Sequence, residues 1–187
     1  AFTVPTYASH ATLLDATKPD YVVVCTPHYS HPDIGIDAMR CGVHVLLEKP
    51  MAVDAGSARA CLAVARETGT TLGVNFAMRL KPVCRQLREL LESGFVGRPL
   101  RVTMTRTTWF RNMAYYRSSP WRATWSGEGG GVLMNQAPHD LDLLIWALGF
   151  PAAVCCDLDT VGHNIEVEDD VMALLKWPGG TRGVLQV

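Results

Sequence analysis

Three buried-strand patterns alternate with helical patterns in the first half of the chain, and this alternation constrains the fold most strongly. DYVVVCT (20–26) is a continuous Val-rich run, which is typical of a strand buried on both faces. VHVLL (43–47) and TTLGVNF (70–76) are the next two strand patterns. Strands joined by helical crossovers form parallel sheets built from right-handed βαβ units. The first half is therefore predicted to be part of a doubly wound α/β domain.

The pattern changes after Gly97. PLRVTMTRTTWF (99–110) alternates apolar and polar residues, as a half-exposed antiparallel strand does. A glycine-rich entry into a helix follows, and then three strand patterns at residues 153–161, 171–177 and 182–187. The predicted fold class is α/β. A partial Rossmann-type parallel sheet (1–97) precedes an α+β domain with a mostly antiparallel sheet (98–187).

The 187 residues are expected to be a piece of a longer protein. No G-x-G-x-x-G follows a strand pattern, and GEGGG (127–131) stands in the wrong half of the chain to open a βαβ unit. GVLQV, at the end, stops within a strand pattern. We expect a leading unit of roughly 30 residues or more, the size of one βαβ, to be missing.

Charge and cysteine usage exclude several classes of protein. A formal net charge of -1, without a long Lys/Arg run, gives no basis for binding nucleic acid or an anionic membrane surface. No apolar run approaches the roughly 20 residues of a membrane-spanning helix. The 6 cysteines form no C-x-x-C pair, which is typical of reduced thiols in the cytosol. A cytoplasmic location is therefore expected, although an export signal would lie upstream of Ala1.

Polar side chains follow each of the three predicted parallel strands. CTPHYSH (25–31) ends the first strand, Glu48 and Lys49 end the second, and Asn75 ends the third. The carboxyl ends of parallel strands meet at one edge, which borders the ligand crevice of open α/β sheets. We therefore expect these side chains to belong to one binding site.

A second polar pair is expected on the helix that starts near Gly131. Asn135 and His139 are four residues apart, so they share one face of a continuous helix. Pro138 favours either a kink or a later helix start. A helix with a polar pair apart from its apolar stripe is suited to line a crevice.

Each feature also has a purely structural interpretation. Glu48 and Lys49 are equally consistent with a solvated ion pair, because such pairs are common on surfaces. His28 and His31 would then cap the helix that follows them, and His139 would be a buried structural histidine. A metal at His28 and His31 is disfavoured because no third ligand lies nearby, so no metal is predicted.

Three segments together resemble one known family. VVVCTPHYSH, GVHVLLEKPMAV and GEGGGVLMNQAPHDLDLLIWALG are similar to segments of the glucose-fructose oxidoreductase / inositol dehydrogenase / MocA family. These proteins are NAD(P)-dependent sugar and cyclitol dehydrogenases. The resemblance covers nearly the whole chain, and the E-K-P motif is its most specific part.

The resemblance implies NAD or NADP as cofactor and a set of residues that contact it. The loop after the first strand would lie along the nicotinamide, and the E-K-P motif would touch the nicotinamide ribose. The W-R pair occurs in some members of the family. The implied cofactor contacts are Thr26, Pro27, His28, His31, Glu48, Lys49, Asn75, Trp121 and Arg122.

The resemblance also implies the catalytic residues. His139 matches the catalytic histidine, and Lys49 reaches the substrate hydroxyl. Asn135 stands where many members carry Asp, so any proton relay that needs a carboxylate there is in doubt. Chemistry supports these roles, because histidine suits proton transfer near neutral pH and a lysine stabilises a developing alkoxide. The nicotinamide carries the hydride.

The implied reaction moves a hydride between a secondary alcohol of a sugar, sugar derivative or cyclitol and the cofactor. The resemblance also implies a homo-oligomer that pairs through the antiparallel sheet. Two alternatives stay open. One is a non-catalytic cofactor- or sugar-binding protein, which the departure at Asn135 favours. The other is an NAD-dependent glycoside hydrolase.

Overall fold

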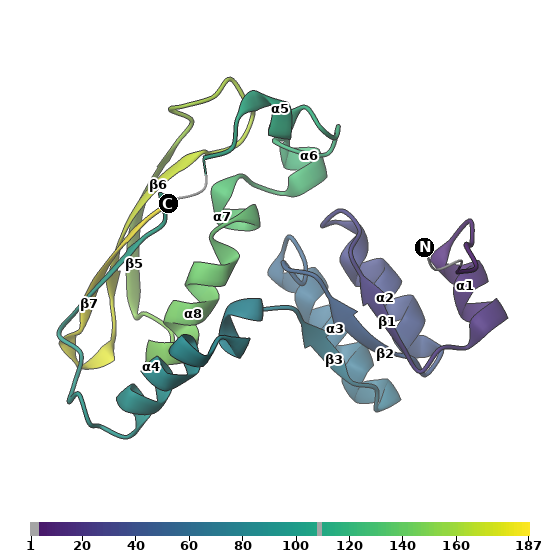
Figure 1. Cartoon of the computed structure of the whole chain (residues 1–187), viewed down its shortest axis with the longest axis horizontal. Coiled ribbons are helices and arrows are strands. Elements are labelled where there is room, and N and C mark those ends of the chain that lie inside the picture. The colour runs from purple at the N-terminus through teal and green to yellow at the C-terminus, as the bar shows by residue number, and fades with distance from the viewer. Residues whose placement is uncertain (1–3, 108–109) are drawn as a thin grey trace. The chain divides into compact units, whose positions relative to one another are not determined.

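The structure is a computed structural model, and it describes residues 4–107 and 110–187 (Figure 1). The chain forms two compact units, Ala1–Asn75 and Phe76–Val187. The predicted strand over 99–110 includes Thr108 and Trp109, which lie outside the described residues.

The first unit contains a three-stranded parallel sheet in the order β1-β2-β3 within its described residues. The strands are β1 (Tyr21–Val24), β2 (His44–Leu47) and β3 (Leu72–Val74). Val24 pairs with Leu47, and Leu47 pairs with Val74, so the three carboxyl ends lie at one edge. The predicted parallel sheet is confirmed.

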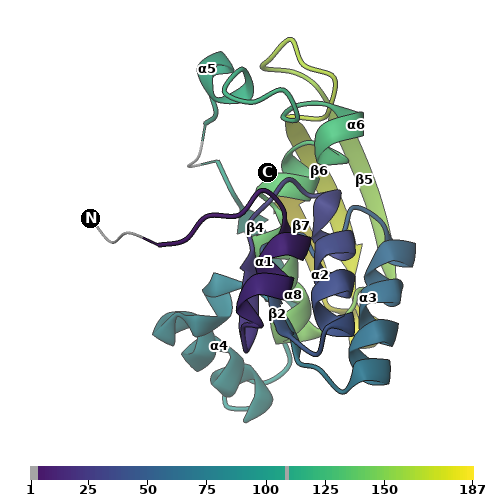
Figure 2. The ribbon, with the colours of Figure 1, turned by 90° about the vertical axis from the view of Figure 1, so that its right-hand side faces the viewer.

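Helices connect these strands as crossovers. They are α2 (Ser30–Arg40), between β1 and β2, and α3 (Ala55–Thr68), between β2 and β3, and the two helices lie side by side (Figure 2). α1 (His10–Thr17) precedes β1. α3 begins after Asp54, whose carboxylate accepts a hydrogen bond from the Ser57 backbone N–H at 2.9 Å. It ends at Gly69, which has a φ of 69°.

The sheet of the first unit is buried on one face, and the prediction that β1 is buried on both faces is wrong for these residues. Val24 and Leu47 point into a core with Met39 of α2. Val23, by contrast, is 50% exposed and Leu46 is 37% exposed. Successive strand residues point to opposite faces, and the helices of this unit pack on the Val24 side.

The second unit contains a four-stranded sheet in the order β4-β7-β6-β5 within its described residues. The β5–β6 and β6–β7 pairs are antiparallel, which confirms the prediction of a mostly antiparallel sheet. β4 pairs with β7 in parallel, so the expectation of an antiparallel strand within residues 99–110 is wrong. The strands are β4 (Arg101–Thr105), β5 (Ala153–Asp159), β6 (Asp170–Lys176) and β7 (Arg182–Gln186).

Helix α8 (Pro138–Leu148) covers one face of this sheet (Figure 1). Leu144 packs there against Ala173, Leu175 and Leu185. The other helical elements of the unit are η1 (Ala77–Leu80), α4 (Pro82–Glu92), α5 (Met113–Tyr116), α6 (Trp125–Glu128), α7 (Val132–Asn135) and η2 (Pro178–Gly180).

Helix α4 belongs to the second unit because it packs against α8 and η1. The division between the units therefore falls after Asn75, ahead of the boundary near Gly97 that the change of sequence pattern suggests. The sequence pattern marks the point where continuous apolar strands give way to strands of alternating apolar and polar residues. The packing of α4 depends on contacts between residues distant in the sequence.

The helix expected from Gly131 is interrupted between Asn135 and His139. α7 ends at Asn135, and α8 begins at Pro138, whose missing N–H is harmless at the first helical position. The Ala137 backbone N–H instead donates to the Val132 carbonyl at 2.7 Å. Of the two outcomes that Pro138 allowed, the later helix start is the observed one.

The glycine-rich segment before α7 lets the backbone pack closely against Glu168. A Cβ on Gly131 would lie 1.8 Å from the carbonyl oxygen of Glu168, so no larger residue fits without moving the backbone. The Glu168 carboxylate accepts hydrogen bonds from the N–H groups of Gly131 and Leu133, at 2.9 and 3.0 Å. These glycines bring two segments of the second unit together.

Candidate active site

The carboxyl edge of the parallel sheet gathers the polar residues predicted there. The Glu48 carboxylate accepts a hydrogen bond from the Asn75 side-chain amide at 2.6 Å. Its second oxygen accepts the backbone N–H of Lys49 at 3.3 Å. Glu48 thus links the segments after β2 and β3, which the solvated ion-pair interpretation did not anticipate.

The exposure of these residues divides them into two groups. Thr26 and Pro27 are exposed, and Glu48, Lys49 and Asn75 are half-buried. These residues are accessible to a small molecule at the sheet edge. The peptide bond between Lys49 and Pro50 is cis.

His28 and His31 form the second group, since they are 4% and 1% exposed. The His31 ring nitrogens face the backbone carbonyls of Thr26, at 2.7 Å, and Pro50, at 2.8 Å. Direct contact between the His31 ring and a ligand, implied by the resemblance, is thus at odds with its burial. The capping interpretation also fails for this ring, because its partners are loop carbonyls and the cap residue Tyr29 makes no side-chain cap bond.

The second unit holds His139 at the start of α8. The His139 ring meets the Phe76 ring edge-on, with centroids 6.2 Å apart. Its neighbours Asp140 and Asp142 are buried, and each forms a two-pronged ion pair with an arginine, Arg106 and Arg79 respectively. The hydrogen bonds that these carboxylates accept raise the pKa of both arginines. Two ion pairs, each between a buried carboxylate and a partly exposed arginine, therefore fix the first turns of α8.

Asn135 contacts a buried carboxylate that sequence reasoning missed. Its side-chain amide donates a hydrogen bond to Glu128, which is 2% exposed. The other Glu128 oxygen accepts the Ala123 backbone N–H at 2.7 Å. The only sequence signal was an acidic residue within GEGGG, and nothing in that pattern indicates burial.

An aromatic and cationic cluster surrounds Asn135. The Tyr115 hydroxyl lies 3.4 Å from the Asn135 amide nitrogen and accepts a hydrogen bond from Arg122 at 2.5 Å. The Arg122 guanidinium also lies 4.3 Å from the Tyr115 ring and 4.5 Å from the Trp121 ring. The predicted W-R pair and Asn135 are thus joined through Tyr115, which sequence reasoning did not select. The predicted site residues form two groups, one on each unit.

A buried His163–Asp169 pair supports this cluster from the segment between β5 and β6. The His163 Nδ1 lies 2.5 Å from the Asp169 carboxylate, and the His163 ring packs edge-on against Tyr116 at 5.1 Å. Burial opposes ionisation of Asp169. Hydrogen bonds from Val161, His163 and Gly162 outweigh it and hold the Asp169 pKa below its ordinary value.

The Asp169→Asn substitution is expected to lower the stability of the protein at neutral pH by about 2 kcal/mol, since it removes hydrogen bonds to a charged group. A depressed folded-state pKa contributes stability above the unfolded value of about 4, and this contribution is lost as pH falls through the folded value. The variant should therefore lose less stability than the parent between about pH 5 and pH 2. Urea unfolding across that range measures the difference.

Asp157→Asn is the matched control, because Asp157 is an exposed carboxylate on β5. Its substitution should change stability by less than about 0.5 kcal/mol. Parallel pH curves for Asp169→Asn and the parent would contradict the assigned role of the Asp169 carboxylate.

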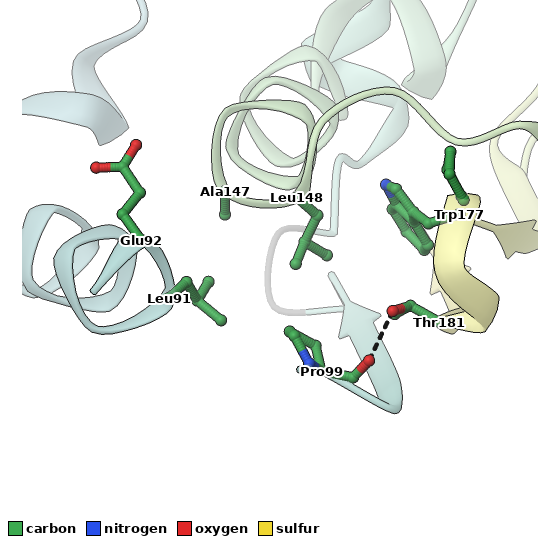
Figure 3. A pocket seen from close by; sticks show the side chains of 8 residues that line it. Leu91, Glu92, Pro99, Ala147, Leu148, Trp177 and Thr181 are labelled. Carbon is green, nitrogen blue, oxygen red and sulfur yellow. Dashed lines mark hydrogen bonds between the residues drawn. The ribbon is translucent and has the colours of Figure 1, made fainter. Parts of the chain in front are cut away.

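A pocket of about 220 Å³ lies elsewhere on the second unit (Figure 3). Most of its lining is apolar, and Thr181 is held by a 2.6 Å hydrogen bond to the Pro99 carbonyl. The pocket contains none of the predicted site residues. Its lining residues are Leu91, Glu92, Pro99, Ala147, Leu148, Trp177, Pro178 and Thr181.

In residues 4–107 and 110–187, no group of three or more His, Cys, Asp and Glu side chains is arranged to hold a metal ion. Over the same residues, no helix has the length and apolar character needed to cross a membrane.

Comparison with known proteins gives two family matches. Residues 1–76 match the model of an oxidoreductase family with an NAD-binding Rossmann fold, and residues 84–187 match the GFO/IDH/MocA C-terminal domain. The chain is 32% identical over 163 residues to 1,5-anhydro-D-fructose reductase of Ensifer adhaerens, covering 86% of this chain and 48% of that protein. It is 32% identical over 172 residues to inositol 2-dehydrogenase of Rhizobium meliloti, covering 89% and 49%.

A solved structure is similar over the same extent. The WlbA dehydrogenase of Chromobacterium violaceum, crystallised with NADH and UDP-GlcNAcA, superposes with a TM-score of 0.91 at 33% identity. The match covers 97% of this chain and 52% of that one. The chain thus spans about half the length of the relatives it matches.

Proposed function

Because the chain belongs to the GFO/IDH/MocA family of oxidoreductases, we propose that it is part of an NAD(P)-dependent dehydrogenase. The reaction transfers a hydride between a secondary alcohol of a sugar, sugar derivative or cyclitol and the nicotinamide. The observation that carries the proposal is the sheet edge where Thr26, Glu48, Lys49 and Asn75 follow three adjacent parallel strands. Ligands of open α/β sheets bind at such edges.

The residues at this edge fit the nicotinamide half of the cofactor. Thr26 and Pro27 offer an exposed loop surface, and Glu48 is held in one orientation by Asn75. Trp121 and Arg122 are proposed as further contacts from the second unit, with the guanidinium held by Tyr115. The nicotinamide, when bound, exchanges the hydride with the substrate carbon. The protein's task is then to bind, orient and move the proton.

His139 is proposed as the general acid/base that takes the proton from the substrate hydroxyl. Lys49 donates a hydrogen bond to the same oxygen and stabilises its developing negative charge. Asn135 orients the substrate, and its own side chain is held by Glu128. An amide carries no charge, so Asn135 serves as a hydrogen-bonding group in this mechanism.

Cofactor binding tests the proposal. The product of the full open reading frame is titrated with NADH and NADPH by fluorescence, and a panel of sugars and cyclitols is then assayed for oxidation. Tight binding of one cofactor with oxidation of a panel member is expected. Absence of binding of either cofactor would overturn the proposal.

Tight cofactor binding without oxidation would favour the second candidate, a non-catalytic binding protein. The observation that favours this candidate is Asn135, which stands where a carboxylate would be expected. Cleavage of an aryl glycoside without net NADH formation would instead point to a glycoside hydrolase.

A homo-oligomer and a cytoplasmic location complete the proposal. The face of the second sheet opposite α8 presents Met172, 56% exposed, and Leu174, 62% exposed, which suits a subunit contact. Leu174→Asp is therefore expected to shift the sedimentation coefficient toward that of the monomer. Val161→Asp, at an exposed position outside the strands, should leave it unchanged. A parent protein that sediments as a monomer at every concentration would contradict the oligomer.

A further inference from the structure

His31 is a buried side chain that touches two loops of the proposed site. Its ring lies between the Thr26 carbonyl, in the loop after β1, and the Pro50 carbonyl, in the loop after β2. We infer that His31 is a positioning residue, which fixes Lys49 by holding the Pro50 carbonyl and the Thr26 carbonyl on one ring. This inference rests on the proposed function of Lys49.

The ring is itself held on a rigid support. α2 carries it, and Ala38 and Met39 anchor that helix in the core with no exposed surface. One turn after His31, Gly35 packs closely on β2, since a Cβ there would lie 3.3 Å from the Leu47 side chain. The helix therefore cannot shift along β2 without losing core contacts. The core thus fixes α2, α2 fixes the His31 ring, and the ring fixes the loop that contains Lys49.

Neighbouring bonds tighten the first loop further. The Ser30 hydroxyl lies 2.7 Å from the Thr26 hydroxyl and 2.7 Å from the Pro27 carbonyl. The loop after β1 is thus tied to the start of α2 by several bonds. The His31–Pro50 bond extends this connection from the same helix to the loop after β2.

The chemistry of the link explains why histidine occupies this position. Both partners are carbonyl oxygens, which accept hydrogen bonds and cannot donate them. Imidazole places its two nitrogens on opposite sides of a flat ring, so one side chain reaches both loops. A neutral ring donates a hydrogen bond to one of the two carbonyls, and a protonated ring donates to both. Phenylalanine would fill the same space without either bond, and glutamine would retain hydrogen-bonding capacity with a different geometry. These two substitutions separate ring volume from bonding.

The inference predicts that His31→Phe lowers kcat by about 10–100-fold, because a displacement of about 1 Å at a reacting group costs on the order of 100-fold. His31→Gln should recover part of that loss. If His31 acts through Lys49, the His31→Phe substitution should cost less than about threefold in a protein that already carries Lys49→Met. This double-mutant cycle is measured in the full protein, with melting temperatures to verify folding. His10→Phe, at a half-buried histidine of the same unit whose ring contacts Asp37 and neither loop, is the control.

An equal loss of kcat in the parent and in the Lys49→Met variant would overturn the inference, because it would mean that His31 acts independently of Lys49.

A second measurement of the same inference does not depend on enzymatic activity. Amide hydrogen exchange at Glu48 and Lys49 in the cofactor-free protein should quicken about tenfold in His31→Phe and stay unchanged in His10→Phe. Unchanged amide exchange in His31→Phe would also overturn the inference. The parent protein could also prove to transfer no hydride while exchange is still faster in His31→Phe. That result would show that the link between the loops is correct and that the proposed function fails. If His31→Phe does not fold, both measurements are made on His31→Gln.

Discussion

Lys49→Met is expected to lower kcat for alcohol oxidation by about 100–1,000-fold, with a smaller change in KM. Methionine retains most of the side-chain length and removes the cation. In the proposed mechanism the ammonium group stabilises the charge that develops on the substrate oxygen. Removing one such donor typically costs about 3–4 kcal/mol of transition-state stabilisation. Initial rates at saturating cofactor, followed by NADH absorbance, give kcat and KM separately.

The structure supports an effect of this size because Lys49 is half-buried and its backbone is constrained. Its N–H donates to the Glu48 carboxylate at 3.3 Å, and the following Pro50 carbonyl is held by His31 at 2.8 Å. A preorganised cation need not be reoriented as charge develops, which is the basis of such stabilisation.

Lys18→Met is the matched control for this prediction. Lys18 is an exposed lysine of the same unit at the end of α1, away from the three strand ends. Its loss should change kcat less than twofold. A Lys49→Met variant whose KM rises while kcat holds would contradict the catalytic role, because that pattern reports binding common to the ground and transition states.

The parallel strand ends were predictable because each step depends on neighbours in sequence. Val-rich runs, helical spacing and the polar residues after each strand are local patterns, and the geometry of parallel sheets then places Glu48 near Asn75. The 2.6 Å bond between them agrees with that expectation. Pro138 likewise indicated either a kink or a later helix start, because the missing N–H of proline has a local effect, and α8 begins there.

The features that sequence reasoning missed depend on burial and hydrogen-bond partners that residue type does not reveal. Glu128 is buried with its carboxylate bonded to the Ala123 backbone N–H and the Asn135 amide, whereas its residue type predicts exposure. Exposed Val23 looks the same in sequence as buried Val24, since periodicity within an apolar run does not tell which faces are covered. His31 was read as a ligand contact or a cap because its backbone-carbonyl partners leave no trace in residue type. Main-chain partners carry no sequence signature.

His139→Gln is expected to lower kcat by about 100–10,000-fold, the usual range for loss of a general acid/base. Glutamine retains polarity and much of the size of the side chain, and it cannot take up the proton. Alcohol oxidation requires the unprotonated imidazole, so the rate should rise with pH in the parent protein. That rise should be absent in the variant. Initial rates across a pH series measure both effects.

His44→Gln, at an exposed histidine on β2, is the control and should retain the parent pH profile. A His139→Gln variant with the parent pH dependence would show that another group moves the proton. The combination with Lys49→Met is more discriminating. In the proposed mechanism both side chains act on one substrate oxygen, so the double variant should lose far less than the product of the two single losses. A loss equal to the product of the two single losses would mean that the two residues act at separate steps. That result would contradict the proposal that both act on one substrate oxygen.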